Sequence, residues 1–482
     1  MQIIKLYAFF SLKFQQILKI TLMYEIIIIG AGSGGIAAAR MASQLGTKVL
    51  LVESGRIGGT CVNVGCVPKK ICSNLAQILY DNNFLHSKYG LMDLSLYKLD
   101  FKQFVEKREA FIKRLNTIYS NILNNDPNID YIQGYAEVYD GFIKVNDVKY
   151  EFSKCILATG SKAKNLNCPK ISVDHVDYVH GTEFLKNSDD FFKLDKVPKK
   201  SVIIGSGYIG IEIAFILNAL GSEVHLIARG KQLLSHFDDI LGENVSMSMK
   251  KHNIRIHYQT KVKRVFTDRL ELVNNEKSFE LNSVDFMMCA IGRDCDLSFI
   301  KCPIESNENF LVVNENFETS LKNVYALGDL IGPNHMLTPV AIFCARKLAE
   351  SLSKKCPIND ISLVKKYRIY ENIPSVVFSH PPCASVGFSE REARKISENV
   401  IIYSSSFFNL AFCFDNIETK EKSIFKIVTI NNKVVGLHLF GTGSDEIVQG
   451  FAVAMKMGAT YDDFKNTIPV HPTAAEEVIT MK

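Results

Sequence analysis

The stretch that decides the fold is YEIIIIGAGSGG, residues 24–35. Its first half is a short, almost wholly apolar run, which is typical of a strand buried within a parallel sheet. The glycines Gly30, Gly32 and Gly35 follow in the spacing G-x-G-x-x-G, and an apolar-faced helix is predicted from there to Leu45. Glycines in this spacing permit a tight turn and let the backbone approach a pyrophosphate at the helix N-terminus.

The next predicted strand, KVLLVE, ends in an acid, Glu53. A carboxylate at this place is suited to hold the hydroxyl groups of a ribose. The glycine loop alone would be weak support, but here strand, loop, helix and acid occur in the required order. The segment is therefore predicted to bind a dinucleotide.

The same pattern occurs a second time. Ser201–Ile204 is another apolar run, and it leads into GSGYIG, residues 205–210. The two loops lie too far apart for one βαβ unit, so each is expected in its own nucleotide domain. After the second strand, EVHLIAR, the place of the acid is taken by Ala228, and Arg229 follows. A cation without a carboxylate suits a 2′-phosphate and favours NADP over NAD, the alternative being a solvated surface arginine.

Two cysteines lie close behind the first loop, in GGTCVNVGCVPKK, residues 58–70. The apolar spacing after Cys66 is helical, which predicts that Cys61 and Cys66 stand at the start of a helix. A disulfide between them would need a distorted first turn, which Gly65 and Pro68 permit. Helix N-termini and nearby lysines lower the pKa of a thiol. The pair is either redox-active, completing a relay from pyridine nucleotide through flavin to disulfide, or two buried structural cysteines.

The composition is that of a globular protein with large cores. The chain has 482 residues, 47% of them hydrophobic, which indicates about three domains of roughly 150 residues each. A formal net charge of +5 is small for this length and argues against a nucleic-acid partner. The other cysteines form no CxxC pair and no cluster with histidine, so no metal is expected. Such scattered cysteines fit a reducing compartment.

The first 22 residues differ from the rest of the chain. They contain no acid, and Lys5, Lys13 and Lys19 interrupt their apolar content, which argues against a membrane span. No small-residue cleavage site of a signal peptide follows. The segment is predicted to be either an organellar presequence or a stretch upstream of a start at Met23. A cytoplasmic location is expected, with an organelle as the alternative.

From Met23 to Lys482 the chain resembles the pyridine nucleotide–disulfide oxidoreductases. Besides the two glycine loops and the cysteine segment, further motifs carry the resemblance. They are LATG (157–160), AIGR (290–293), VYALGD (324–329), LTPVA (337–341), SHPPCASVG (379–387) and HPTAAEE (471–477). Within the family the chain is most similar to members that reduce glutathione disulfide.

The resemblance implies an α/β fold with two Rossmann-type dinucleotide-binding domains, for FAD and NADPH, and a C-terminal α+β dimerisation domain. It also implies a homodimer whose active site is shared between subunits. The expected limits are an N-terminal extension at 1–22, an FAD-binding domain at 23–160 and an NADPH-binding domain at 161–292. A central segment at 293–369 is expected to complete the FAD domain, and an interface domain to span 370–482.

The resemblance also implies catalytic roles. Cys61 matches the thiol that attacks the substrate disulfide, and Cys66 matches the thiol next to the flavin. Lys69 and Glu212 match an ion pair beside the flavin. The alternative for Glu212 is a solvent-facing position, but its apolar neighbours favour burial, where a carboxylate needs a partner.

His471 and Glu476 match an acid–base pair that the partner subunit supplies. A neutral imidazole can take up and return a proton while a carboxylate orients the ring. Thr473 and Glu476 also have the spacing of a capping box, so Glu476 could instead cap a helix. His471 could alternatively be an ordinary interface histidine.

One FAD per subunit and NADPH are the cofactors implied. Asp329 matches a ligand of the flavin ribityl chain, and Tyr208 matches a ring that covers the empty nicotinamide pocket. The FAD contacts are expected at Gly30, Gly32, Ser33, Gly34, Gly35, Glu53, Thr60, Lys69, Thr159, Gly160, Asp329 and Thr338. The NADPH contacts are expected at Gly205, Gly207, Tyr208, Ile209, Gly210, Glu212, Arg229, Gly292 and Arg293.

Glutathione disulfide is the substrate implied, with contacts at Ala37, Arg40, Tyr119, Arg346 and His471. Trypanothione reductases, whose substrate is cationic, carry an acid in place of Ala37 and Trp in place of Arg40. Reduction of another small disulfide, or a dihydrolipoamide dehydrogenase docked in a larger complex, are the alternatives.

Three departures from the glutathione-reducing members bear on specificity. Ser235 stands where they have a second arginine for the 2′-phosphate, and Gly210 where NADPH-dependent members often have alanine. Both reduce the expected margin of NADPH over NADH, and neighbouring His236 or Lys231 could substitute for the missing arginine. Ile122 replaces a substrate-site asparagine. Cys383 replaces an aliphatic residue, for which the sequence offers no explanation.

Overall fold

The computed structural model describes residues 22–85, 99–166, 179–275, 277–333, 336–353, 362–414, 416 and 420–482. The chain divides into two compact units, each built from three segments. The first comprises the described residues up to Asn63 together with Lys113–Lys162 and Asp294–Ile369; the second comprises Val64–Ile112, Ala163–Arg293 and Tyr370–Lys482. The prediction of a presequence or upstream start at 1–22 lies, apart from Leu22, outside the described residues.

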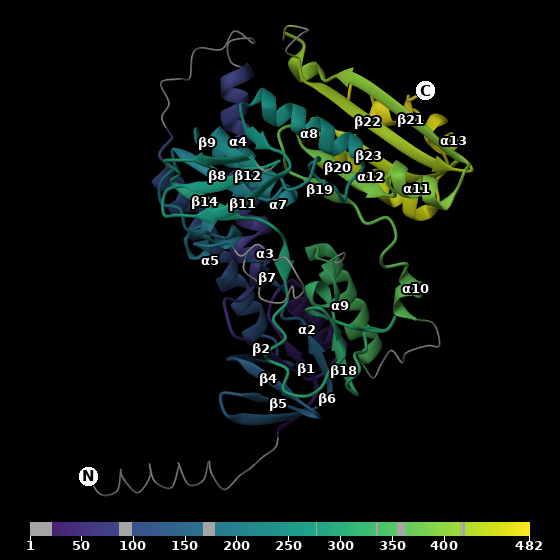
Figure 1. Ribbon diagram of the computed structural model, residues 1–482. Helices are drawn as coiled ribbons and strands as arrows, with labels where there is room; N and C mark the ends of the chain where they lie inside the picture. The colour runs from purple at the N-terminus through teal and green to yellow at the C-terminus, as the bar shows by residue number, and fades with distance from the viewer. Residues whose placement is uncertain are drawn as a thin grey trace, which may run out of the picture. The chain divides into compact units, whose positions relative to one another are not determined.

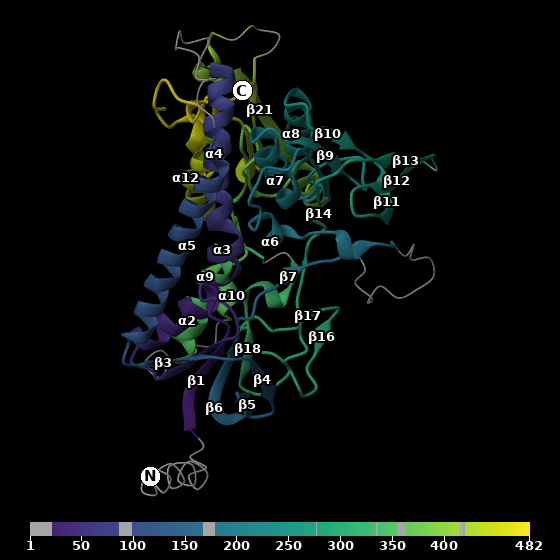
Figure 2. The ribbon, with the colours of Figure 1, turned by 90° about the vertical axis from the view of Figure 1, so that its left-hand side faces the viewer.

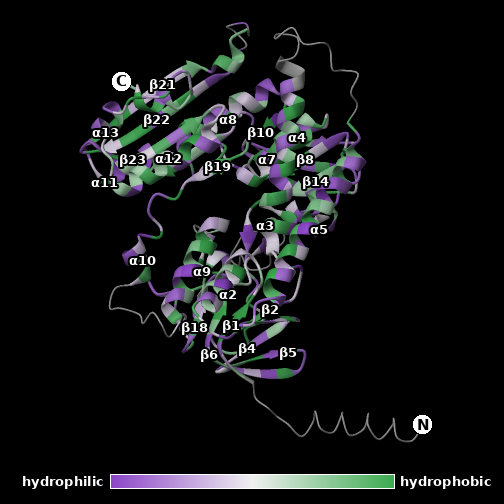
Figure 3. Ribbon diagram, turned by 180° about the vertical axis from the view of Figure 1, so that it is seen from behind, coloured by the Kyte–Doolittle hydropathy of each residue, from purple (hydrophilic) through white to green (hydrophobic). Residues whose placement is uncertain are grey.

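The first unit is built on a sheet with the strand order β3-β2-β1-β6-β5-β4, and β18 also pairs with β6. β1 (Leu22–Ile29) lies between β2 (Val49–Glu53) and β6 (Val148–Leu157) and is parallel to both. The other strands are β3 (Ile129–Gln133), β4 (Ala136–Tyr139), β5 (Phe142–Val145) and β18 (Val324–Ala326). Ile26, Ile27 and Ile28 of β1 are at most 1% exposed, so the apolar run is buried on both faces, as predicted (Figure 3).

Two helices of the first unit pack against each other although they lie far apart in sequence (Figure 1). α2 (Ser33–Gln44) directly follows β1, and α9 (Thr338–Leu352) comes after β18. Small residues allow the close approach, because a Cβ on Gly34 would lie 2.8 Å from Leu327 Cδ1 and 3.6 Å from Ala341 Cβ. The segment after residue 293 therefore contributes both a strand and a helix to the fold around the first glycine loop.

The second unit contains another parallel sheet, with the order β10-β9-β8-β14. Its strands are β8 (Lys200–Ile204), β9 (Glu223–Ile227), β10 (Arg255–His257) and β14 (Phe286–Cys289). α7 (Tyr208–Ala219) follows β8, and α8 (Asp239–Lys251) follows β9. α4 (Cys66–Leu85) packs on α7, where the Tyr80 hydroxyl donates to the carbonyl of Phe215 at 2.8 Å. A small antiparallel sheet, β11 (Thr260–Val265), β12 (Leu270–Asn274) and β13 (Lys277–Leu281), extends from this part (Figure 2).

The two parallel sheets repeat the same local geometry. Gly30 has a φ of +102°, and a Cβ on it would lie 2.4 Å from the carbonyl oxygen of Ala158. Gly205 has a φ of +121°, and a Cβ on it would lie 2.3 Å from the carbonyl oxygen of Ala290. Only glycine fits this conformation and this spacing, so each loop passes tightly beneath a neighbouring strand end. The recurrence seen in the sequence is therefore a recurrence in structure.

The C-terminal part of the second unit is an antiparallel sheet with the order β19-β20-β23-β22-β21. Its strands are β19 (Ser375–Val377), β20 (Cys383–Gly387), β21 (Val400–Phe408), β22 (Lys422–Ile430) and β23 (Lys433–Phe440). The helices of this part are α11 (Glu390–Ile396), α12 (Ser444–Met457), α13 (Tyr461–Lys465) and α14 (Glu476–Ile479). The predicted α/β class with a C-terminal α+β part is confirmed, while the expected domain limits stay a prediction.

The remaining elements are short or connect these sheets. The helices are α3 (Gly59–Val64), α5 (Phe101–Asn124), α6 (Ser188–Phe191) and α10 (Leu363–Tyr367), with 3-10 turns η2 (Thr182–Phe184), η3 (Gly328–Ile331) and η5 (Leu410–Phe412). The strands are β7 (Lys162–Ala163), β15 (Arg293–Asp294), β16 (Ser306–Asn307) and β17 (Phe310–Leu311).

Candidate dinucleotide and dithiol site

The first glycine loop is held by the acid predicted to bind a ribose. Glu53 accepts a hydrogen bond from the backbone N–H of Ala31 and another from that of Gly55, both at 2.6 Å. The carboxylate is only half-buried, so it lies at the surface of the loop. α2 starts at Ser33 with Gly32 as its N-cap, and the N–H groups of a first helical turn have no partner within the helix.

Other expected FAD contacts of the first unit follow β6 and β18, which lie on the other side of β1 from β2 and Glu53. Thr159 is exposed, and Gly160 has a φ of +69° with no atom within 4 Å of the place of a Cβ. Asp329, at the start of η3, accepts a hydrogen bond from the Ser161 hydroxyl. Thr338 is half-buried at the first turn of α9. Open backbone, anion-binding N–H groups and ribose-binding carboxylates are what a dinucleotide such as FAD requires, so these residues fit it.

The cysteine segment is not one helix but two. Cys61 lies inside α3, whereas Cys66 is the first residue of α4, and the helix is broken at Gly65. The predicted helix start is confirmed for Cys66, whereas Cys61 lies on a separate short helix before it, and the expected local distortion is present at Gly65. Cys61 is partly buried and Cys66 is exposed, so they are not two buried structural cysteines. Thr60, the remaining FAD contact expected here, is exposed on α3.

Two asparagines that sequence reasoning missed fix the segment around Cys61. The Asn63 side-chain amide donates to the carbonyls of Ile57 at 3.0 Å and Gly59 at 2.8 Å. Asn116 on α5 donates to the Asn63 side-chain oxygen at 2.9 Å. Asn63 is buried, which makes these contacts costly to lose. In the sequence, only the position of Asn63 between the two cysteines could have indicated this role, and that position does not identify Asn116 as its partner.

The expected ion pair between Lys69 and Glu212 is present. Lys69 Nζ lies 3.0 Å from Glu212 Oε1, and the side chain of Glu212 is only 5% exposed, so it is buried rather than solvent-facing. The same oxygen accepts the backbone N–H of Phe378 at 2.9 Å. Lys69 Nζ also lies 3.7 Å from the centre of the Phe378 ring. Phe378 was not predicted, because its role rests on its backbone and on contacts across the fold.

The second glycine loop presents its expected residues at the surface. Gly207 is exposed with no atom within 4 Å of the place of a Cβ, and Tyr208 at the start of α7 is 39% exposed. Gly210 is different, because a Cβ on it would lie 2.3 Å from the carbonyl oxygen of Gly205. Backbone packing therefore explains a glycine at this position, and the narrower margin of NADPH over NADH stays a prediction. Ile209 is half-buried beside it.

The strand register identifies the counterpart of Glu53 in the second sheet. Ile29 pairs with Val52 in the first sheet, and Ile204 pairs with Ile227 in the second. The residue after the second pair is Ala228, which is buried, and Arg229 follows exposed. Gly292 has a φ of +115° with no atom within 4 Å of the place of a Cβ, and Arg293 is half-buried next to it. A cation stands beside the position where the first sheet has an acid.

The expected acid–base pair is present near the C-terminus. His471 Nδ1 lies 2.8 Å from Glu476 Oε2, and the imidazole is 77% exposed. The Thr473 backbone N–H donates to the other oxygen of Glu476 at 3.2 Å. The hydrogen bond from His471 holds the pKa of Glu476 below its usual range. Glu476 thus orients the imidazole and also binds the backbone of Thr473. The predicted capping box is not formed, because α14 starts at Glu476 itself with Ala475 as its N-cap, and the Thr473 hydroxyl donates to the carbonyl of Val470.

The expected substrate residues of the first unit lie on three helices. Arg40 on α2 and Arg346 on α9 are both exposed, and these two helices pack against each other. Ala37 on α2 is buried, and Tyr119 on α5 is half-buried, as is Ile122 one turn further. The structure therefore brings two cations onto adjacent helices, whereas the small size of Ala37 serves packing.

Cys383, the unexplained substitution, lies on β20 with no exposed surface. Burial raises the pKa of its thiol to about 12. It acts as a small apolar side chain of the core rather than as a thiolate. Among the described residues no group of three metal-binding side chains occurs, and no helix there is long and apolar enough to cross a membrane.

Comparisons with known proteins agree with this arrangement. A family model described as pyridine nucleotide-disulphide oxidoreductase matches residues 24–345, and the dimerisation domain of that family matches residues 373–482. The chain belongs to this family. It is 37% identical to a glutathione reductase of Debaryomyces hansenii over 501 residues, covering 95% of this chain and 98% of that protein. It is 35% identical to a glutathione reductase of Yarrowia lipolytica, covering 95% of this chain and 99% of that protein.

Proposed function

We propose that the chain is an FAD-dependent enzyme that uses NADPH to reduce glutathione disulfide to two molecules of glutathione. The observation that carries the proposal is a pair of surface-accessible cysteines in a chain with two dinucleotide-binding loops, one with an acid at the ribose position and one with Arg229 beside it. Similarity along nearly the whole chain to two curated glutathione reductases supports it.

The dithiol performs the disulfide exchange. The Cys61 thiolate attacks one sulfur of glutathione disulfide, which forms a mixed disulfide and releases one glutathione thiolate. His471, with its ring oriented by Glu476, takes the proton that the Cys61 thiol loses and returns it to that leaving thiolate. The Cys66 thiolate then attacks the Cys61 sulfur, which releases the second glutathione and leaves a Cys61–Cys66 disulfide. When bound, FAD supplies the two electrons from NADPH that reduce this disulfide again.

We propose that the ammonium group of Lys69 supplies a fixed positive charge beside the flavin. Lys69 is held by Glu212 and lies over Phe378, so its ammonium group has one position in a largely buried setting. We propose that Glu53 and Asp329 accept hydrogen bonds from hydroxyl groups of FAD. Tyr208 is exposed at the start of α7, and we propose that its ring covers the nicotinamide position until NADPH binds.

The substrate class follows from charge. Glutathione disulfide is anionic, and Arg40 and Arg346 present cations on two adjacent helices of the first unit. A cationic disulfide such as that of trypanothione would be repelled by the same pair. We infer a cytoplasmic homodimer in which His471 and Glu476 act on Cys61 of the partner subunit.

The assay that tests the proposal is NADPH oxidation by the purified flavoprotein. Glutathione disulfide, trypanothione disulfide and lipoamide are compared at equal concentration, with NADH as the second nucleotide. Rapid turnover is expected only with glutathione disulfide and NADPH. Turnover confined to another disulfide would retain the relay and refute the substrate argument from Arg40 and Arg346.

A further inference from the structure

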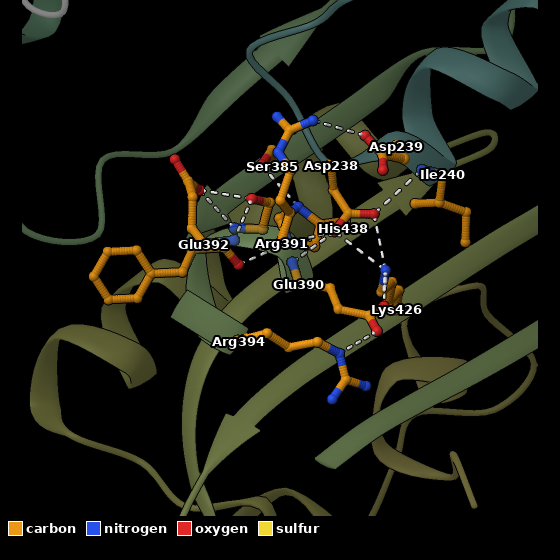
Figure 4. Close-up of polar contacts among 12 residues, drawn as sticks. Asp238, Asp239, Ile240, Ser385, Glu390, Arg391, Glu392, Arg394, Lys426 and His438 are labelled. Atoms are coloured by element: carbon orange, nitrogen blue, oxygen red, sulfur yellow. Dashed lines mark hydrogen bonds and ion pairs between the residues drawn. The ribbon is translucent and has the colours of Figure 1, made fainter. Parts of the chain in front are cut away.

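A buried carboxylate joins the second dinucleotide-binding sheet to the C-terminal sheet. Asp238, 2% exposed, caps α8 by accepting the backbone N–H of Ile240 at 3.2 Å. Its other oxygen accepts the backbone N–H of Glu390, the first residue of α11, at 2.9 Å. Lys426 Nζ on β22 donates to both oxygens, at 3.0 and 3.2 Å (Figure 4). The starts of two helices from different parts of the fold are thus fastened to one side chain.

The surroundings of Asp238 make this junction rigid. Lys426 also pairs with Glu390 Oε2 at 2.7 Å, and His438 Nε2 lies 3.8 Å from Asp238 Oδ2. Ser385 bonds to the other nitrogen of His438 at 2.9 Å. Burial alone would raise the pKa of Asp238, but His438, the Glu390 amide and Lys426 together hold it below its usual range. The start of α11 is therefore connected to the start of α8 through Asp238.

This junction places Arg391 on the loop between β9 and α8. One guanidinium N–H donates to the carbonyl oxygen of Ser235 at 3.1 Å, and the other terminal nitrogen lies 3.4 Å from Asp239 Oδ1. The Gln232 side-chain amide donates to the same Asp239 oxygen at 3.0 Å. The Arg391 side chain is 49% exposed, so the guanidinium is held by the protein and still open to a ligand.

The loop that Arg391 contacts is the one that follows Arg229. It is tied to the second glycine loop, because the backbone N–H of Leu234 donates to the carbonyl of Ser206 at 3.1 Å. Leu234 is buried, and its φ of +51° shows that the loop is bent to reach this place. The exposed charged groups from Arg229 to Asp239 are Arg229, Lys231 and Asp239, with His236 as a titratable neighbour. Arg391 adds a further cation from the C-terminal part of the chain.

We infer that Arg391 is a specificity-determining residue that binds the 2′-phosphate of NADPH together with Arg229. This inference rests on the proposed function and assigns a residue of the C-terminal domain to nucleotide choice. A guanidinium has five N–H donors, so its contacts with Ser235 and Asp239 leave donors for phosphate oxygens. The Ser235 carbonyl and the Asp238 junction preorganise it, which reduces the entropy lost on binding.

The test measures binding of two nucleotide fragments to the purified holoenzyme by calorimetry. The probes are 2′,5′-ADP, which carries the 2′-phosphate, and 5′-AMP, which lacks it. Arg391→Ala is expected to weaken 2′,5′-ADP binding by about tenfold, the loss of one charge-assisted hydrogen-bonded contact, and to leave 5′-AMP unchanged. Arg394→Ala is the matched control, because Arg394 lies on the same helix and is exposed but pairs with Glu390. Ser235→Arg in the Arg391→Ala background is expected to restore part of the preference.

Each outcome separates the inference from the proposed function. If the wild-type protein binds both fragments equally, the NADPH assignment fails and the inference fails with it. If the wild type prefers 2′,5′-ADP and Arg391→Ala keeps that preference, only the inference is overturned. An equal loss for both fragments would mean that Arg391 merely shapes the loop, which also overturns direct phosphate binding.

Discussion

At the residue scale, the charge and orientation of each candidate catalytic group depend on a few close neighbours. Glu212 is buried, and it is tolerated there because Lys69 and a backbone N–H satisfy the same oxygen. His471 is exposed, so its orientation depends on Glu476 rather than on packing. Substitution of one partner in such a pair therefore changes the charge balance or the orientation of the other residue, in addition to removing a contact.

The first prediction concerns that histidine. His471→Gln is expected to lower turnover of glutathione disulfide by about a hundredfold or more, since a general acid contributes factors of this size. Glu476→Gln is expected to lower it less, because the imidazole remains but loses its charged partner. Steady-state kinetics with glutathione disulfide measures both effects.

A matched control is Glu477→Gln, whose carboxylate instead accepts a hydrogen bond from the Ser405 hydroxyl at 2.7 Å. NADPH oxidation by an artificial electron acceptor, which needs no proton transfer to glutathione, should stay at the wild-type level in all three variants. Loss of that activity in His471→Gln would contradict a role confined to the disulfide half of the reaction.

At the element scale, helix starts are where the parts of the second unit are joined. Asp238 caps α8 and at the same time holds α11 through the N–H of Glu390. The second junction lies at the other end of α8, where His252 follows the helix and its ring centre is 4.5 Å from that of Tyr80 on α4. His380 stacks on the same tyrosine at 4.3 Å between ring centres. Both junctions depend on the ionisation state of buried groups.

The second prediction removes the charge at the first junction. Asp238→Asn keeps the shape of the side chain but leaves Lys426 with Glu390 as its one counter-charge within 4 Å among the described residues. Breaking a buried pair from one side costs about 3–5 kcal/mol, so the apparent melting temperature should fall by several degrees. Asp239→Asn, one residue on and exposed, should change stability by no more than about 0.5 kcal/mol. Equal shifts in thermal denaturation would contradict the buried-pair argument.

The third prediction concerns pH at the second junction. Burial lowers the pKa of His252 to about 4 and that of His380 to about 3, with nearby Lys251 acting in the same direction. Gln77, which bonds to His380, adds no charge. The unfolded chain binds protons near pH 6.5, well above these values, so stability is full above about pH 6.5 and falls as the pH decreases toward 4.

Thermal denaturation from pH 7.5 to 4.5 measures this effect. The apparent melting temperature of His252→Gln should depend less steeply on pH than that of the wild type, because one titrating group is gone. An exposed-histidine control, His236→Gln, should keep the wild-type slope. A flat wild-type profile below pH 6.5 would contradict the assignment.

At the scale of the whole molecule, the proposed sharing of the active site between subunits would require two copies of the chain. The C-terminal residues 373–482 match the dimerisation domain of the family, and this part carries His471. The cysteine segment lies near the other end of the chain. If His471 acts on Cys61 of the partner subunit, a monomer contains both the cysteines and the histidine but no complete active site.

The fourth prediction tests the shared site by complementation. Cys61→Ser and His471→Ala homodimers should each be nearly inactive with glutathione disulfide. After subunits are mixed and exchanged, roughly a quarter of the wild-type activity should return, since half of the dimers are mixed and each contains one complete site. Mass spectrometry of the intact dimers confirms the exchange. No recovery with confirmed exchange would refute a site shared between subunits.

The features that could be predicted from the sequence are those formed by residues close together in the chain. Local order along the chain determined the two glycine loops, the acid Glu53, its replacement by Ala228 and Arg229, and the spacing of the cysteines. Strand, turn and helix are encoded by neighbouring residues, so these features could be predicted. The helix break at Gly65 was anticipated as a distortion, but not as two separate helices, because a helical apolar pattern continues across it.

Only the tertiary structure decided which distant residues meet. No periodicity connects Phe378 with Glu212, Asn116 with Asn63, or Arg391 with Ser235, because these contacts arise when separate elements pack. The sequence also did not reveal why residue 210 is a glycine, because the reason is the close approach of the Gly205 carbonyl oxygen. By itself the sequence determined the class of chemistry, through motifs whose residues are close in the chain. The fold decided how the reactive groups are held and charged, because burial and partner distance exist only in three dimensions.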